Sequence, residues 1–189
     1  MRVLQAEGYS EPRDALAQEW AGFLHAALPD AAWLPLPNLG AGHIRAYCER
    51  WGINRLILSG GEDAGVSRLR DETELDLLGW ATEHQLPALG ICRGMQMMSL
   101  GAGVNLKPVA SHVRTRHVLQ GALTSEVNSF HHYALAGCPQ HFEITARTED
   151  GEIEAMRHTG LRWEGWMWHP EREKPFQSAD IERLRKLFE

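Results

Sequence analysis

The stretch Leu86–Met98, LPALGICRGMQMM, decides the fold. It begins with a short apolar run typical of a buried strand, and helical spacing resumes over Met95–Leu100. Gly90 and Gly94 flank Cys92, and glycine is needed where a Cβ would clash in a tight strand-to-helix turn. We therefore predict a strand, a sharp turn and a helix that present Cys92 at the carboxyl edge of a sheet, exposed rather than buried.

The predicted turn gives Cys92 the surroundings of a nucleophile. The helix behind it directs free backbone N–H groups and a partial positive charge toward the sulfur, which favours the thiolate over the thiol. The alternative is a small core residue, because free cysteine is among the most buried residue types. The other cysteines, Cys48 and Cys138, are widely spaced, so the odd count of three supports neither a disulfide framework nor a zinc knuckle.

The composition is that of one soluble globular domain covering residues 1–189. Hydrophobic residues make up 43% and charged residues 23%, and no apolar run is long enough to cross a membrane. Charged residues follow soon after the N-terminus, unlike a secretory signal, so we expect a cytoplasmic protein. A net charge of −6 argues against a nucleic-acid partner, and the scattered arginines are interpreted mostly as solvated surface.

Upstream of Cys92, apolar runs alternate with segments of helical spacing. The first helix is expected to open near Ser10 or Glu11, with Pro12 in its first turn, and to end at Pro29. The other helices are expected at 42–51 and 71–84, and the strands at 3–6, 31–36, 54–59 and directly before the cysteine. Four strands alternating with helices predict an α/β fold with a parallel sheet covered on both faces.

Downstream of Gly103 the pattern changes to short strands separated by turn residues, which predicts antiparallel hairpins or edge strands. These segments are 104–107, 117–119, 126–128, 142–146, 153–156 and 161–168. An amphipathic helix over 179–188 closes the chain.

A cysteine nucleophile needs a base within hydrogen-bond reach and a group that orients the base. His169 and Glu171 follow an aromatic-rich strand, and residues two apart in an extended segment project to the same side. The carboxylate could then fix the tautomer of the imidazole and support the imidazolium. Taken alone the pair reads as surface residues at a strand end, but the predicted turn at Cys92 favours a base and its orienting group.

An acyl-transfer site also needs two donors for the developing oxyanion. The backbone N–H of Arg93 is one candidate, and the Gly60–Gly61 pair after a neighbouring strand can supply the other. His131 and His132 suggest a metal, but adjacent residues point in different directions and no spacing completes a ligand set. We therefore predict no metal and no cofactor, and a polar loop that contacts substrate.

Four motifs together resemble the class I glutamine amidotransferases, and within them the γ-glutamyl-γ-aminobutyrate hydrolase branch of the C26 peptidases. They are SGGED (59–63), GICRGMQ (90–96), VNSFHH (127–132) and WHPE (168–171). The resemblance implies a flavodoxin-like fold with a mostly parallel central sheet and a C-terminal antiparallel β addition. It also implies a triad of Cys92, His169 and Glu171 that hydrolyses a γ-glutamyl amide, a small-molecule substrate, through a γ-glutamyl thioester.

The same resemblance implies roles for further residues. Oxyanion donors map to the backbone of Gly61 and Arg93. The residues that would contact the glutamyl group are Gly60, Gln96, Asn128, Ser129, Phe130 and His131.

The chain is shorter than expected for that branch. Two of its stretches, 9–20 and 168–176, resemble a small bacterial subgroup, the γ-glutamyl-CDP-amidate hydrolases that act in capsule polysaccharide biosynthesis. Arg13 would then meet an anionic leaving group, or else form a helix-start salt bridge with Glu11 or Asp14. A stand-alone hydrolase is the favoured hypothesis. The alternatives are a glutaminase subunit that supplies ammonia to a separate synthetase, and a non-catalytic thiol sensor.

Overall fold

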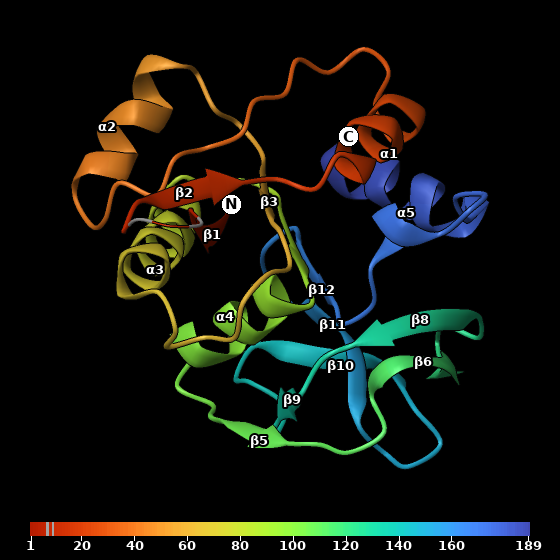
Figure 1. Ribbon diagram of the computed structural model, residues 1–189. Coiled ribbons are helices and arrows are strands. Elements are labelled where there is room, and N and C mark those ends of the chain that lie inside the picture. Colours follow the sequence, from red (N-terminus) through yellow and green to blue (C-terminus); the bar gives the residue numbers. More distant parts are fainter. Residues whose placement is uncertain (7, 9) are drawn as a thin grey trace.

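A six-stranded sheet forms the centre of the computed structural model, which describes residues 1–6, 8 and 10–189 (Figure 1). In spatial order its strands are β3 (Leu56–Leu58), β4 (Ala88–Ile91), β12 (Trp163–Trp166), β11 (Ile153–His158), β10 (Phe142–Arg147) and β7 (Gln120–Gly121). β3, β4 and β12 run parallel, and the other neighbours pair antiparallel. The carboxyl ends of three adjacent strands therefore meet at one edge.

Helices cover both faces of this sheet (Figure 1). One face carries α2 (His43–Arg50), α3 (Arg68–Glu83) and α4 (Arg93–Gly101), and the other carries α1 (Glu19–Ala27) and α5 (Ser178–Phe188). β4 shows why two layers form, because successive strand residues point to opposite faces. Ala88 packs in the cluster of α3 and α4, whereas Leu89 and Ile91 pack in the cluster of α1 and α5. The α/β class is confirmed.

Three two-stranded pieces flank the main sheet. They pair β1 (Arg2–Gln5) with β2 (Pro12–Ala15), β5 (Leu106–Pro108) with β9 (Tyr133–Leu135), and β6 (Val113–Val118) with β8 (Glu126–Phe130). A short 3₁₀ turn, η1 (Pro170–Arg172), precedes α5. Antiparallel pairing downstream of Gly103 is confirmed for β5 to β11. The prediction is partly wrong for 161–168, because β12 is a central strand that pairs antiparallel with β11 but parallel with β4. Within the described residues, no helix has the length and apolarity needed to cross a membrane.

The predictions for the first forty residues are partly wrong. The expected helix start, Pro12–Ala15, is a strand, because this polar segment lacks an apolar helical stripe and Asp14 accepts hydrogen bonds from Asn38. The helical stripe begins only at Trp20, inside α1. Tyr9, in the stretch likened to the hydrolase subgroup, lies outside the described residues.

The sheet also has fewer parallel strands than predicted. Residues 31–36 form no strand, since Pro35 and Pro37 offer no N–H to a strand ladder. β1 pairs with β2 in a separate hairpin rather than in the main sheet. Two of the four predicted parallel strands, β3 and β4, are in the main sheet. The third parallel strand is β12, in the segment 161–168 that was expected to be antiparallel or at an edge, and antiparallel strands from the second half of the chain complete the sheet.

Candidate active site

The strand-to-helix turn at Cys92 is present as predicted. Cys92 has φ +50° and ψ −104°, a conformation that strains any residue with a side chain. A Cβ on Gly94 would lie 2.1 Å from the carbonyl oxygen of Leu58, and one on Gly90 would lie 2.6 Å from the backbone of Gly94. The two glycines therefore let α4 pack directly onto β3 and β4.

The cysteine itself is more covered than predicted. Its side chain is 5% exposed and belongs to the apolar cluster that contains Trp166 and Trp168. The expectation of an exposed residue is wrong, because the chain beyond β12 returns over the turn and brings His169 against the thiol. The local sequence determined the turn at Cys92, whereas the segment beyond β12 determined how deeply the Cys92 side chain is buried.

His169 and Glu171 form a buried pair at η1. His169 Nδ1 lies 2.7 Å from Glu171 Oε1, and each side chain is 2% exposed. A carboxylate only accepts hydrogen bonds, so Nδ1 carries the proton and Nε2 is the nitrogen left for Cys92. Burial alone would lower the pKa of His169, but the hydrogen bonds to Cys92 and Glu171 outweigh burial and raise that pKa to about 9.

The other two cysteines have different surroundings. Burial raises the pKa of the Cys48 thiol to about 11 and also raises the pKa of Cys138. Both thiols are thereby held in their unreactive form. Of the three cysteines, Cys92 lies beside an imidazole, that of His169.

The loop after β3 lies against the imidazole. A Cβ on Gly60 would be 2.4 Å from His169 Cε1, and one on Gly61 would be 2.1 Å from Arg70 Nη1. Only glycine fits at these two contacts, so the loop can approach the site closely. The N–H of Arg93 is in the first turn of α4, where backbone N–H groups have no intrahelical acceptor.

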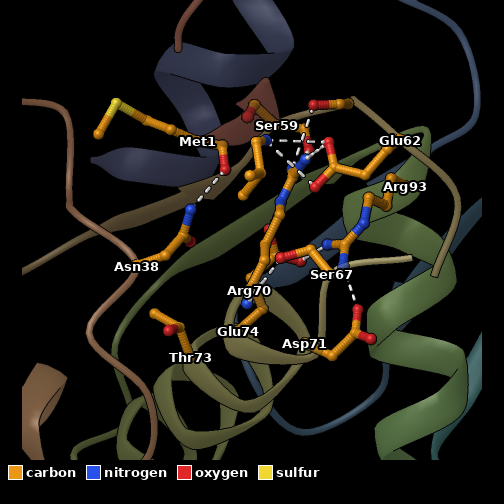
Figure 2. Close-up of polar contacts among 12 residues, drawn as sticks. Met1, Asn38, Ser59, Glu62, Ser67, Arg70, Asp71, Thr73, Glu74 and Arg93 are labelled. Carbon is orange, nitrogen blue, oxygen red and sulfur yellow. Dashed lines mark hydrogen bonds and ion pairs between the residues drawn. The ribbon is translucent and has the colours of Figure 1, made fainter. Parts of the chain in front are cut away.

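Arg70 of α3 fixes this loop and was missed by the sequence analysis, which interpreted most arginines as surface. Its side chain is fully buried, and Nη2 donates to the carbonyl oxygens of Ser59 at 2.8 Å and Gly60 at 3.1 Å. Nη1 and Nε bind the carboxylates of Glu62 at 2.9 Å and Glu74 at 2.7 Å (Figure 2). The interpretation as solvated surface is wrong for this residue.

Arg93 completes the same group of charges. Its buried guanidinium binds Glu74 of α3 through Nη1 and Asp71 through Nη2 (Figure 2). The side chain thus points to α3. We call this group the arginine–carboxylate cluster, and its members are Glu62, Arg70, Asp71, Glu74 and Arg93.

Three of the predicted substrate residues bind neighbouring protein groups. Asn128 donates to the carbonyl oxygen of His169 at 2.8 Å and accepts from the His169 N–H at 3.0 Å. Gln96 donates to the carbonyl oxygen of Tyr133 at 2.8 Å, and Ser129 donates to a backbone carbonyl at 2.7 Å. Asn128 therefore holds the backbone of the histidine, and all three side chains are buried.

Phe130 lies at the rim of the site. Its ring is 36% exposed and stands edge-on to His169, with 6.0 Å between ring centroids. The guanidinium of Arg172 lies 4.7 Å from the centre of the Phe130 ring. An aromatic face and a cation thus border the candidate catalytic pair, and Arg172 was not singled out from the sequence.

Two further predicted residues lie elsewhere. His131 is buried and faces His112 and Glu154 rather than an open loop. Arg13 is on β2, 56% exposed, with Nε 2.5 Å from Glu11 Oε1. The structure contains the ion pair foreseen for Arg13, although on a strand rather than at a helix start.

Comparison with known proteins places the chain in a family. The sequence model described as "Glutamine amidotransferase class-I" matches residues 41–184. The γ-glutamyl-CDP-amidate hydrolase of Campylobacter jejuni is 29% identical over 186 residues, covering 95% of this chain and 92% of that protein. The pyocyanine-specific anthranilate synthase component 2 of Pseudomonas aeruginosa is 33% identical over 151 residues, covering 72% and 68%.

Solved structures show the same fold. A protein from Thermoplasma acidophilum described as part of a GMP synthase aligns with a TM-score of 0.70 at 19% identity, covering 90% of this chain and 85% of that one. A glutamine amidotransferase from Methylobacillus flagellatus aligns with a TM-score of 0.57 at 17% identity, covering 88% and 68%.

Proposed function

Because this chain belongs to the class-I glutamine amidotransferase family, we propose that it hydrolyses a γ-glutamyl amide through a thioester on Cys92. One observation carries the proposal. Cys92 lies on a strained turn at the amino end of α4, beside His169, and helps to raise the pKa of that imidazole. Nδ1 of His169 lies 2.7 Å from Glu171. A nucleophile, a base and a group that orients the base are the parts that covalent acyl transfer requires.

In the proposed mechanism the Cys92 sulfur attacks the γ-carbonyl carbon, and the thiol proton resides on His169. The carbonyl oxygen becomes an oxyanion that the backbone N–H groups of Gly61 and Arg93 stabilise. His169 gives its proton to the amine nitrogen as the carbon–nitrogen bond breaks. Water then attacks the thioester while His169 takes a proton, the carbon–sulfur bond breaks, and glutamate leaves.

For the substrate, we propose γ-glutamyl-CDP-amidate or a similar γ-glutamyl conjugate of surface polysaccharide biosynthesis. The likeness to the Campylobacter jejuni hydrolase extends over 92% of that protein and supports this choice. Arg172 over Phe130 supplies a cation and an aromatic face beside His169, which suit an anionic nucleotide leaving group. Arg13 would be a further contact, and the reaction would take place in the cytoplasm, where Cys92 stays reduced.

A second candidate is a glutaminase that passes ammonia to a separate synthetase. The likeness to anthranilate synthase component 2 favours this candidate. The chemistry at Cys92 would be the same, and activity on glutamine would then depend on a partner.

The test is glutamate release by the purified protein alone from glutamine, γ-glutamyl-γ-aminobutyrate and γ-glutamyl-CDP-amidate. We expect turnover of a conjugate, and a loss on the order of 10⁴-fold or more in Cys92→Ser. Cys138→Ser, which changes an exposed thiol, is the matched control and should keep full activity.

Activity confined to glutamine would support the ammonia-supplying candidate instead. No release from any of the three compounds, or release that persists in Cys92→Ser, would overturn the proposed hydrolysis.

A further inference from the structure

A second group of buried ionisable residues lies apart from the catalytic pair, between the β6–β8 hairpin and the main sheet. His112 precedes β6, His131 follows β8, and Glu154 is on β11. All three side chains are 2% exposed or less. We call them the histidine–carboxylate cluster.

The three facing atoms form a nearly equilateral triangle. His112 Nδ1 and His131 Nε2 are 3.3 Å apart, and they lie 3.6 Å and 3.2 Å from Glu154 Oε1. A tetrahedral zinc site with bonds of about 2.0–2.1 Å has ligand atoms about 3.3–3.4 Å apart. The observed triangle therefore has the size of one face of such a tetrahedron.

The outer contacts of the two imidazoles fix their tautomers. His131 Nδ1 lies 3.1 Å from the carbonyl oxygen of Tyr133, and His112 Nε2 lies 2.9 Å from Asp150 Oδ2. Both outer partners are acceptors, so each outer nitrogen carries the proton and each inner nitrogen of a neutral ring offers a lone pair. A carboxylate or carbonyl behind the imidazole is the usual support of a metal-bound histidine.

Glu154 gives the independent sign of a missing partner. Its side chain is fully buried, and among the described residues neither carboxylate oxygen has a hydrogen bond of good geometry. The groups beside Oε1 are the two imidazoles, at 3.2 Å and 3.6 Å. A buried carboxylate without hydrogen bonds is costly unless a cation compensates it. Two imidazole nitrogens and one carboxylate oxygen match zinc and similar ions, whereas magnesium and calcium prefer oxygen ligands alone.

We propose that His112, His131 and Glu154 bind one divalent transition-metal ion of the zinc type, with a solvent molecule as fourth ligand. Such an ion would tie the β6–β8 hairpin to β11. The same hairpin carries Asn128, which holds the backbone of His169, so the ion would stabilise the wall of the candidate active site without touching the reacting atoms.

The experiment uses the full chain after dialysis against a chelator, with Cys92→Ala to remove the thiol from competition. We expect one equivalent of Zn²⁺ to bind, and Co²⁺ to give the visible absorption of a tetrahedral complex. At a free Zn²⁺ concentration about 100 times the dissociation constant, the melting temperature should rise by roughly 5–10 °C. Mg²⁺ at the same concentration should leave it unchanged.

Variants identify the ligands. Glu154→Gln keeps the shape of the side chain and removes its charge, so Zn²⁺ affinity should fall at least about 100-fold. His132→Asn, at the exposed neighbouring histidine, is the matched control and should bind Zn²⁺ as before. The Cys92→Ala titration needs no substitution in the cluster, so it remains decisive even if Glu154→Gln does not fold.

Three results would overturn the proposal. One is a melting temperature of Cys92→Ala that Zn²⁺ does not raise, the result expected if the cluster holds only a proton. The second is a Co²⁺ spectrum without the tetrahedral bands. The third is equal Zn²⁺ affinity in Glu154→Gln and its parent.

Discussion

The two buried clusters of this protein contain similar groups and differ in how their charges are compensated. In the arginine–carboxylate cluster, Glu74 binds the guanidinium groups of both Arg70 and Arg93. In the histidine–carboxylate cluster, Glu154 is as deeply buried, but among the described residues its oxygens have no hydrogen bond of good geometry and face two imidazoles instead of guanidinium groups. Arginine is always charged, and its planar guanidinium donates hydrogen bonds and accepts none. A neutral imidazole, in contrast, has a nitrogen lone pair that can bind a cation.

This difference separates a scaffold from a binding site. The arginine–carboxylate cluster is compensated by its own members and holds the loop at Gly60 beside His169. The histidine–carboxylate cluster presents three inward atoms to a cation, which is a proton in the metal-free protein and, in our proposal, a metal ion in its place. A buried charged group by itself therefore does not indicate a ligand site. A buried charged group that its neighbours leave without good hydrogen bonds does.

The largest effect should come from Glu74→Ala. It removes the carboxylate that Arg70 and Arg93 share, and it leaves two buried cations with fewer partners. The free energy of unfolding should fall by about 3–5 kcal/mol, measured by urea denaturation. A loss below 1 kcal/mol would contradict the view that this cluster is a self-compensated scaffold.

A smaller effect is expected from Asp150→Asn at the other cluster. Asp150 is exposed and accepts from His112 Nε2, so the substitution changes the support of a proposed ligand and not the ligand itself. Zn²⁺ affinity should fall about 10–100-fold, measured by competition with a chromogenic chelator. Unchanged affinity would show that the hydrogen bond from His112 Nε2 to Asp150 does not support metal binding at His112 Nδ1.

The candidate catalytic pair is an intermediate case, because the group that compensates the buried Glu171 carboxylate is the protonated imidazole of His169. His169 has its pKa raised from 6.5 to about 9, burial being outweighed by Cys92 and Glu171. The imidazolium is thus present below pH 9, and its contribution to stability, complete below about pH 6.5, is lost as the pH rises toward 9.

Activity should follow the same titration, so kcat/KM should decline above about pH 9. Glu171→Gln removes a charge that raises the pKa, and the alkaline limb should move down by about one unit or more. The measurement is a pH profile of kcat/KM for both proteins. Superimposable profiles would argue against Glu171 as the orienting group.

The smallest effect should come from Glu72→Ala on the exposed side of α3. Glu72 pairs with Arg68, whose side chain is 91% exposed, in the same i, i+4 arrangement as Arg70 and Glu74. Stability should change by less than about 0.5 kcal/mol in urea denaturation, because solvent screens the pair. A loss as large as that of Glu74→Ala would mean that burial is not what distinguishes the scaffold cluster.

Much of the site was predictable because short motifs define local turns. Gly90 and Gly94 predicted the turn at Cys92, and the structure confirms it with a positive φ. His169 and Glu171 were expected to pair because residues two apart in an extended segment project to the same side. Their side chains do lie 2.7 Å apart, but Glu171 is in the 3₁₀ turn η1 and not in an extended segment. The catalytic roles of these residues stay a prediction until they are tested.

The errors fall where partners are distant in the chain. The segment 12–15 was expected to open a helix, but it is a strand whose Asp14 accepts hydrogen bonds from Asn38, 24 positions away. His131 looked like a loop residue because its partners, His112 and Glu154, are 19 and 23 positions away. No spacing rule covers such separations.

The sequence by itself determined the α/β class, the turn at Cys92 and the order of the motifs, because periodicity and glycine placement act over a few residues. The tertiary structure decided which charges meet. Arg70 binds the carbonyl oxygen of Gly60, ten positions away. Asn128 binds the backbone of His169, and Glu154 faces two imidazoles, over larger separations along the chain. Burial makes these contacts strong by excluding water, and burial is a property of the packed chain rather than of any segment.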